Sequence, residues 1–183
     1  PDLGLDGNHG IRFVFPHAPA IPVTINQGYV MPAWYDILEM SLERKIDTAQ
    51  IEQSASSIRA LIAQENERGV PSEHIVIAGF SQGGAVAYQT ALSYDKPLAG
   101  LLTLSTYLAT KDSLVLSDAN KNLKIAIHHG TQDPVVPVQL GQEAKAWLES
   151  KGYQPQFYSY PMAHQVCMPQ LKIIGKWLND VLA

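Results

Sequence analysis

Gly79-Phe80-Ser81-Gln82-Gly83 follows the apolar run Ile75-Val76-Ile77-Ala78 and precedes small and apolar residues at helical spacing. This context predicts a strand, a sharp turn and a helix, with the serine at the apex of the turn. In such a nucleophile elbow the flanking glycines let the backbone fold back on itself, so that the serine oxygen stands clear of the sheet. The N–H of Gln82 then points at the same space. The motif is short, and its position between a strand and a helix is what makes it informative.

Two further residues that such a serine needs lie downstream, in the order Ser, Asp, His. Residues 124–130 are predicted to form a strand, and Asp133 follows it in a turn. Residues 156–161 are predicted to form the next strand, and His164 comes three residues after the proline that ends it. The carboxyl ends of parallel strands meet at one edge of an open α/β sheet, where ligands bind. We therefore expect Ser81, Asp133 and His164 to lie together.

Each of these residues also has a purely structural interpretation. Ser81 fits an ordinary turn serine, although flanking glycines after a buried-type strand argue against that role. Asp133 precedes a proline, and an aspartate in that position commonly forms an Asx-turn, so its local sequence leaves two roles open. His164 fits a surface loop histidine.

Other residues compete for the same chemistry. His128 and His129 lie at the end of a predicted strand, where a hydrogen-bonded structural role is expected, whereas His164 alone follows the last strand. Cys167 lies three residues from His164, but it lacks a glycine elbow, and a small apolar role is expected for it.

Five motifs occur in order and at plausible spacing: Pro16-His17-Ala18-Pro19, Met31-Pro32-Ala33-Trp34-Tyr35-Asp36, Gly79-Phe80-Ser81-Gln82-Gly83-Gly84, the His-Gly-x-x-Asp-x-x-x-Pro run at 129–137, and Tyr160-Pro161-Met162-Ala163-His164. Together they resemble the small bacterial carboxylesterases, which belong with acyl-protein thioesterases and lysophospholipases in the α/β-hydrolase superfamily. By this resemblance Ser81 is the nucleophile, His164 the general base and acid, and Asp133 the orienting carboxylate. The resemblance also implies the N–H of Gln82 as one oxyanion donor.

The chain departs from this family at its beginning. Family members carry a strand and a His-Gly-Leu-Gly type loop before the segment that opens this sequence, and that loop supplies the second oxyanion donor. Nothing here matches it, since Gly4-Leu5-Asp6-Gly7 lies in the wrong place. The absent strand would run between a strand predicted at 11–15 and the strand before Ser81, and without it backbone groups on both would be unpaired. We therefore expect the functional protein to be longer at its N-terminus.

Strand and helix patterns alternate along the chain. Strands are predicted at 11–15, 75–78, 99–105, 124–130 and 156–161, and helices at 48–68, 82–93, 138–151 and from the last strand to residue 182. For the helix at 48–68, Asp47 is the expected N-cap, Gln50 stands at the capping-box position, and Gly69 with Pro71 ends it. The alternation predicts a mainly parallel sheet with helices on both faces. The resemblance implies that this α/β architecture is the α/β-hydrolase fold, without its N-terminal strand and oxyanion loop.

Length and composition predict one globular domain over residues 1–183, and the resemblance implies that this domain is incomplete at its N-terminus. The formal net charge is −4 with no basic stripe, so neither nucleic acid nor an anionic membrane surface is expected as a partner. No apolar run approaches the roughly 18 residues of a membrane span. A single cysteine excludes an internal disulfide and fits a reducing, cytoplasmic location.

The proline-rich stretch from residue 16 to residue 36 is predicted to be a long loop that leaves the carboxyl end of a strand, and we expect it to wall the site. Trp34 is the candidate for lining an acyl pocket, with packing that anchors the loop as the alternative. The resemblance adds Tyr107 and Val135 to the substrate-binding candidates.

The expected reaction is two-step acyl transfer from an ester or thioester to Ser81 and then to water. It needs no metal ion or organic cofactor. The substrate alternatives are a small carboxylic ester, a lysophospholipid and an S-acylated protein. The resemblance also implies a homodimer. A non-catalytic binding protein on a hydrolase fold stays open as a different class of function.

Overall fold

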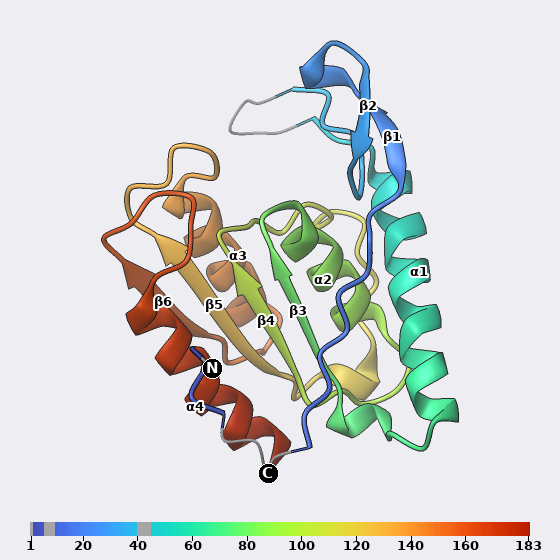
Figure 1. Cartoon of the computed structure of the whole chain (residues 1–183), viewed down its shortest axis with the longest axis vertical. Coiled ribbons are helices and arrows are strands. Elements are labelled where there is room, and N and C mark those ends of the chain that lie inside the picture. The colour runs from blue at the N-terminus through green and yellow to red at the C-terminus, as the bar shows by residue number, and fades with distance from the viewer. Residues whose placement is uncertain (1, 6–9, 40–44) are drawn as a thin grey trace.

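The computed structural model describes residues 2–5, 10–39 and 45–183, and four parallel strands form its central sheet. Across the sheet they are β3 (Val76–Phe80), β4 (Gly100–Leu104), β5 (Lys124–Gly130) and β6 (Gln156–Tyr160). All four run upward in Figure 1, so the residues that follow their carboxyl ends gather at the upper edge of the sheet. This arrangement confirms the four strands predicted after residue 70.

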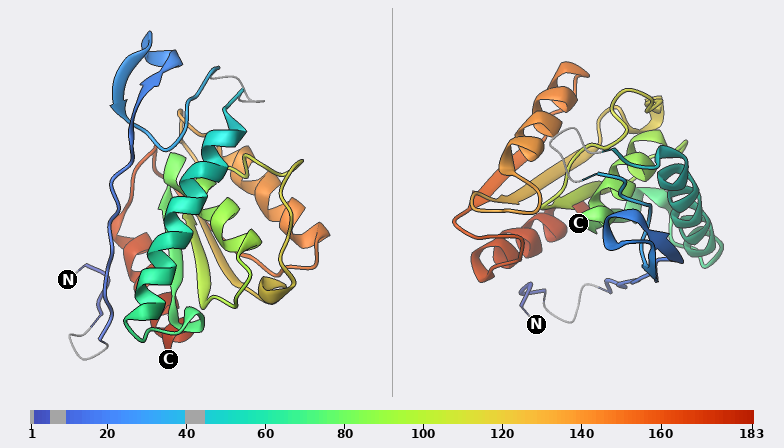
Figure 2. Two further views of the ribbon diagram at one scale, coloured as in Figure 1. Left: turned by 90° about the vertical axis from the view of Figure 1, so that its right-hand side faces the viewer. Right: turned by 90° about the horizontal axis from the view of Figure 1, so that it is seen from above.

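Helices cover both faces of the sheet, as predicted (Figure 2). They are α1 (Thr48–Glu67), α2 (Gln82–Ser93), α3 (Val138–Ser150) and α4 (Met168–Leu182). Successive strand residues point to opposite faces, so Leu101 packs in the cluster that contains α1, α2 and α3 residues, whereas Leu102 packs with Ile174 and Trp177 of α4. Both leucines are at most 4% exposed, and burial of each contributes about 1.5–3 kcal/mol.

The start of α1 confirms the predicted N-cap and corrects the predicted capping box. The Asp47 carboxylate accepts the N–H of Gln50 at 3.0 Å, and Gly69, at φ 92°, follows the helix end. The Gln50 carboxamide does not reach back to Asp47. Its Oε1 accepts the N–H of Asp36 at 2.7 Å instead, because the chain that enters α1 passes beside this first turn.

Residues 11–15 do not form the predicted strand. The segment is extended, since the Phe13 and Phe15 rings stack with centroids 6.3 Å apart, but it enters no ladder with the described strands. It runs past the sheet on the way to the hairpin (Figure 1), and Arg12 pairs with Glu65 of α1. An alternating pattern favours an extended backbone, but a strand also needs a partner with free hydrogen-bonding groups. Consequently β3 is the edge of the described sheet.

A β-hairpin lies inside the stretch predicted as a loop from residue 16 to residue 36. Strand β1 (Ala20–Val23) pairs antiparallel with β2 (Tyr29–Pro32), and the short 3₁₀ turn at Thr24–Asn26 connects them. The Asp36 carboxylate accepts both the N–H and the hydroxyl of Thr24, at 2.8 and 2.6 Å. Prolines in this stretch argued against strands, but each strand of a two-stranded ribbon has a free edge, where a residue without N–H is tolerated.

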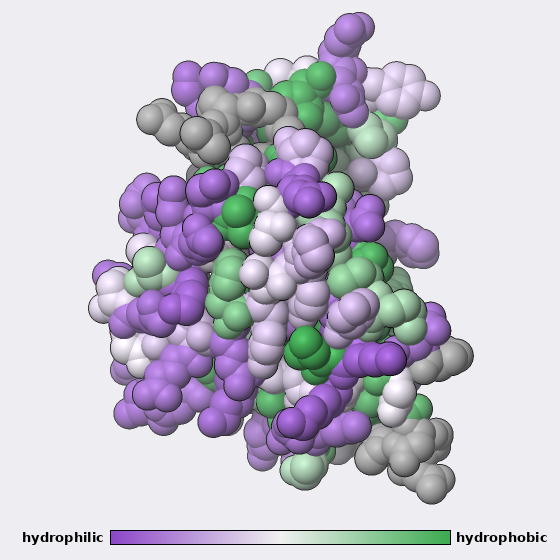
Figure 3. Space-filling view, turned by 90° about the vertical axis from the view of Figure 1, so that its left-hand side faces the viewer, coloured by the Kyte–Doolittle hydropathy of each residue, from purple (hydrophilic) through white to green (hydrophobic). Residues whose placement is uncertain are grey.

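The opposite edge of the sheet is β6. Figure 3 looks onto the side of the molecule that carries β6 and α4, and hydrophilic side chains cover most of it, with hydrophobic ones in small separate patches. No helix in the described part of the chain is both long and apolar enough to cross a bilayer.

Candidate active site

The turn between β3 and α2 has the geometry of an elbow. Ser81 lies at φ 51° and ψ −120°, a conformation that non-glycine residues rarely adopt. Its N–H donates to the carbonyl of Leu104 at 2.8 Å, and its carbonyl accepts the Thr106 hydroxyl at 2.5 Å. A Cβ at Gly79 would overlap the backbone of Gly83, so the close return of the chain requires glycine there. The end of β4 therefore holds the strained serine from two sides.

The three residues predicted to meet do lie together at the carboxyl edge of the sheet. The His164 Nε2 atom is 2.9 Å from Ser81 Oγ, and His164 Nδ1 is 2.7 Å from Asp133 Oδ2. A carboxylate only accepts, so Nδ1 carries the proton and Nε2 is free to accept the serine hydroxyl proton. The Phe80 ring packs against the imidazole, with centroids 4.8 Å apart. This chain of hydrogen bonds can move a proton from Ser81 to His164.

Asp133 takes both of the roles that its local sequence left open. Its Oδ1 accepts the N–H groups of Val135 and Val136, each at 2.8 Å, which is the Asx-turn interaction. Its Oδ2 accepts from His164. The carboxylate side chain is fully buried, so these three donors replace water around its charge.

The Asp133 turn and the His164 loop are joined through their backbones. The N–H of Thr131 donates to the Tyr160 carbonyl at 2.8 Å, and the N–H of Gln132 donates to the Met162 carbonyl at 3.1 Å. A Cβ at Gly130 would overlap the carbonyls of residues 162 and 163, which leaves glycine as the residue that permits this approach. The two turns therefore form one unit, and the carboxylate and the imidazole keep their separation.

His128 and His129 have the hydrogen-bonded structural roles that the sequence predicts. His129 Nε2 donates to the Val136 carbonyl at 2.8 Å, and so supports the Asp133 turn from below. His128 Nδ1 bonds to the Tyr160 hydroxyl at 2.9 Å. Burial lowers the pKa of both imidazoles, that of His128 to about 4, so both are neutral at neutral pH.

Gln82 begins α2, directly after the serine. Within the described residues its backbone N–H donates to no acceptor, as expected for the first residue of a helix. A free N–H group that lies next to Ser81 at a helix N-terminus can stabilise a negative charge. Thr106, which fixes the Ser81 carbonyl, was not anticipated from the sequence, because a lone threonine 25 residues downstream carries no motif.

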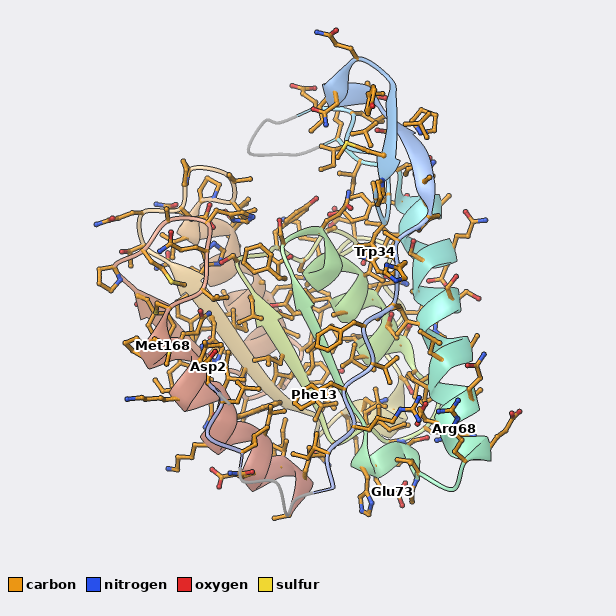
Figure 4. The ribbon with its side chains drawn as sticks, viewed as in Figure 1. Asp2, Phe13, Trp34, Arg68, Glu73 and Met168 are labelled. Carbon is orange, nitrogen blue, oxygen red and sulfur yellow. The ribbon has the colours of Figure 1, made fainter. Side chains whose placement is uncertain are left out.

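The three predicted substrate-binding residues lie around this centre to different degrees. Trp34 is half-buried, and a Cβ at Gly83 would stand 3.7 Å from its indole Nε1, so the ring lies over the first turn of α2. Tyr107 is 8% exposed, and its hydroxyl bonds to that of Tyr35. Val135 is 39% exposed beside Asp133. Figure 4 shows Trp34 at the base of the hairpin, near the start of α1.

The stretch compared with the family's oxyanion loop lies away from this centre. Leu3 and Leu5 pack against the α4 cluster, on the face of the sheet opposite α2. Asp6 and Gly7 lie outside the described residues.

The chain is similar to known proteins over most of its length. A family model described as Phospholipase/Carboxylesterase matches residues 7–182. Acyl-protein thioesterase 1 of Neurospora crassa is 38% identical over 182 residues, which cover 94% of this chain and 74% of that protein. The counterpart from Mycosarcoma maydis is 36% identical over 188 residues, which cover 94% of this chain and 78% of that protein.

Solved structures share the architecture. The crystal structure of Arabidopsis thaliana SOBER1 aligns with a TM-score of 0.91 at 30% identity and covers 100% of this chain and 89% of that one. That of Zea mays acyl-protein thioesterase 2 aligns with a TM-score of 0.81 at 25% identity and covers 92% of this chain and 80% of that one. The parallel sheet with helices on both faces is thus the predicted α/β-hydrolase fold.

Proposed function

This chain belongs to the phospholipase/carboxylesterase family, and from that premise we propose that it is a carboxylesterase that works through Ser81, His164 and Asp133. The coarser statement, a serine hydrolase of esters or thioesters, holds for the family and its α/β-hydrolase relatives. The continuous hydrogen-bonded path from Ser81 Oγ through the imidazole to the buried carboxylate carries the proposal.

In the proposed mechanism His164 Nε2 removes the Ser81 hydroxyl proton as Oγ attacks the acyl carbonyl carbon. The carbonyl oxygen becomes an oxyanion and accepts a hydrogen bond from the N–H of Gln82. When the tetrahedral intermediate collapses, the bond to the leaving oxygen or sulfur breaks and His164 returns the proton to it. Water, deprotonated by His164, then attacks the acyl-enzyme and releases the carboxylic acid. Asp133 stays ionised and holds the imidazole in the required tautomer throughout.

A thioester of an acylated protein is the second candidate substrate. The relatives named acyl-protein thioesterase 1, at 36–38% identity, favour it, and a thioester presents the same carbonyl to Ser81 with a better leaving group. Turnover of matched octanoyl esters and octanoyl thioesters separates the two candidates. A ratio of kcat/KM that favours the ester by about tenfold supports a carboxylesterase, and the reverse supports a thioesterase.

The test of the proposed mechanism is Ser81→Ala, assayed on p-nitrophenyl acetate and butyrate. Loss of the nucleophile is expected to lower kcat by on the order of 10⁴-fold or more. Ala fills the same space without the hydroxyl, so the circular dichroism spectrum and the melting temperature serve as controls for the fold. Activity near that of the wild type would contradict the mechanism.

A further inference from the structure

The side chain of Gln82 joins two parts of the site that are far apart in the chain. Its Oε1 accepts the backbone N–H of Trp34 at 2.8 Å, and its Nε2 donates to the backbone carbonyl of Tyr35 at 2.7 Å. These partners lie 48 and 47 residues away in sequence. One carboxamide therefore binds two consecutive residues of a distant backbone, with both its donor and its acceptor used.

The wall segment, which we define as residues 33–36, receives its other anchors from different directions. The Ser54 hydroxyl on α1 donates to the Trp34 carbonyl at 2.5 Å, and Gln50 on the same helix accepts the N–H of Asp36. The Tyr35 hydroxyl bonds to that of Tyr107 at 2.8 Å. Of these contacts, the one from Gln82 begins at the residue next to the nucleophile. It therefore ties the wall segment to the reacting centre itself.

The hydrogen bonds from the Gln82 carboxamide position the side chain of Trp34. Part of its ring packs against the cluster that contains Tyr35, Ile51 and Ala85, and the indole nitrogen lies over Gly83. A half-buried indole over the first turn of α2 lies within one helical turn of Ser81. A long acyl chain on Ser81 that ran over this turn would contact the indole.

We propose that the Gln82 side chain is a specificity-determining positioning residue, which sets the acyl-chain preference of the enzyme by fixing Trp34. The proposal rests on the proposed function. In the proposed mechanism the backbone N–H of Gln82 faces the carbonyl oxygen of the substrate. The carboxamide of the same residue holds the wall segment that the acyl chain contacts. Gln82 thus fixes the position of Trp34 relative to the N–H group that binds the reacting carbonyl. Contacts with single methylene groups discriminate substrates by about 10-fold or more. Displacement of the wall segment should therefore change the ratio of kcat/KM between long and short acyl esters.

The variant that tests this is Gln82→Met, which keeps the length of the side chain and the backbone N–H but loses both hydrogen bonds. The matched control is Gln64→Met, the same change on the exposed surface of α1. We expect the ratio of kcat/KM for p-nitrophenyl octanoate to that for the acetate to fall by about fivefold or more in Gln82→Met. The change is expected mainly in KM for octanoate, and the control is expected to keep the ratio of the wild type. A ratio that is unchanged or higher in Gln82→Met overturns the proposal.

A double-mutant cycle tests whether Gln82 acts through Trp34. Trp34→Ala is expected to lower the octanoate-to-acetate ratio by a similar factor, and Gln82→Met in that background is expected to lower it little further. Additive effects overturn the proposal. If Gln82→Met fails to fold, Trp34→Ala alone decides, because an unchanged ratio there leaves Gln82 nothing to position.

Labelling by a fluorophosphonate distinguishes failure of the positioning role of Gln82 from failure of the proposed function. A wild-type protein that is labelled at Ser81 but has an unchanged ratio in the variants overturns the positioning role alone. An unlabelled wild type overturns the proposed function, and this inference with it.

Discussion

The elbow at Ser81 and the wall segment lie beside each other at the site, yet different kinds of bonds hold them. The elbow ends a strand whose five residues all pair with β4, and its own N–H continues that pairing to Leu104. The wall segment bonds backbone to backbone only at its ends, through Ala33 and Asp36. The backbone of Trp34 and Tyr35 at its centre is held by the side chains of Gln82 and Ser54. Main-chain pairing survives most substitutions, whereas each side-chain anchor is removed by one mutation. Because the elbow carries Ser81, mutations near it should change turnover. Because the wall segment carries Trp34, mutations around it should change substrate preference.

The largest effect beyond loss of the nucleophile is expected for Asp133→Asn. The Asn oxygen still accepts the N–H groups of Val135 and Val136, so the turn stays folded, but its NH₂ group faces His164 Nδ1. The imidazole then carries its proton on Nε2 and does not accept from Ser81. We expect kcat to fall by on the order of 10³–10⁴-fold with KM little changed, as measured on p-nitrophenyl acetate. A decrease below tenfold would show that turnover by Ser81 and His164 does not depend on the Asp133 carboxylate.

The second prediction concerns the stability of the sheet beneath the site. Burial lowers the pKa of His128 from 6.5 to about 4 in the folded protein. The unfolded chain binds a proton below pH 6.5 while folded His128 stays neutral, so its contribution is complete above pH 6.5 and is lost as pH falls toward 4. Between pH 7 and pH 5 the free energy of unfolding should decrease by about 2 kcal/mol through this group.

His128→Phe removes the titrating group and keeps a ring beside Tyr158 and Tyr160. Urea unfolding at pH 7 and pH 5 should then show a difference smaller by about 2 kcal/mol than in the wild type. The same difference in both proteins would mean that His128 is not the group that titrates. The absolute stability of the variant does not enter this comparison.

A smaller effect is expected for Thr106→Val, which removes the hydroxyl that holds the Ser81 carbonyl. Valine matches threonine in shape, and Ser81 keeps its N–H bond to Leu104, so the elbow loosens without unfolding. We expect kcat to decrease by about tenfold, equivalent to one hydrogen bond of about 1.4 kcal/mol, for short and long esters alike. Thr106→Ser retains the donor and should keep most of the activity. A change in chain-length preference instead would mean that Thr106 affects substrate preference, as the wall segment does.

The smallest effect is expected for Asp36→Ala, at the far end of the wall segment. This change removes the two hydrogen bonds to Thr24 in the turn that connects β1 and β2, both of which are solvent-exposed. The free energy of unfolding should fall by about 1 kcal/mol or less, measured by urea denaturation. Turnover of p-nitrophenyl acetate should stay within about twofold of the wild type. A loss comparable to that of Thr106→Val would show that the hairpin supports the reacting centre directly.

The sequence predicted the elbow side well because its signals are local. A parallel strand followed by a turn places the next polar residue at the carboxyl edge, and this rule alone brings residues 81, 133 and 164 to one place. The prediction that Asp133 has one of two roles was too narrow, because a carboxylate has two oxygens and each takes one role.

The wall side was predicted poorly because its structure depends on partners that are distant in sequence. Residues 11–15 have a strand pattern but no partner among the described strands, and the hairpin at 20–32 lay in a stretch dominated by its prolines. The carboxamide of Gln82 carries no signal that it bonds to Trp34 and Tyr35, nearly fifty residues away. Such side-chain anchors become visible only in three dimensions.

Covalent labelling with a fluorophosphonate, followed by peptide mass spectrometry, tests whether Ser81 is activated by His164. We expect one adduct, located on Ser81, in the wild type, and on the order of 10³-fold slower labelling in His164→Ala, because the serine then lacks its base. Labelling at another residue, or an equal rate in His164→Ala, would contradict the claim that Ser81, His164 and Asp133 act as one catalytic unit.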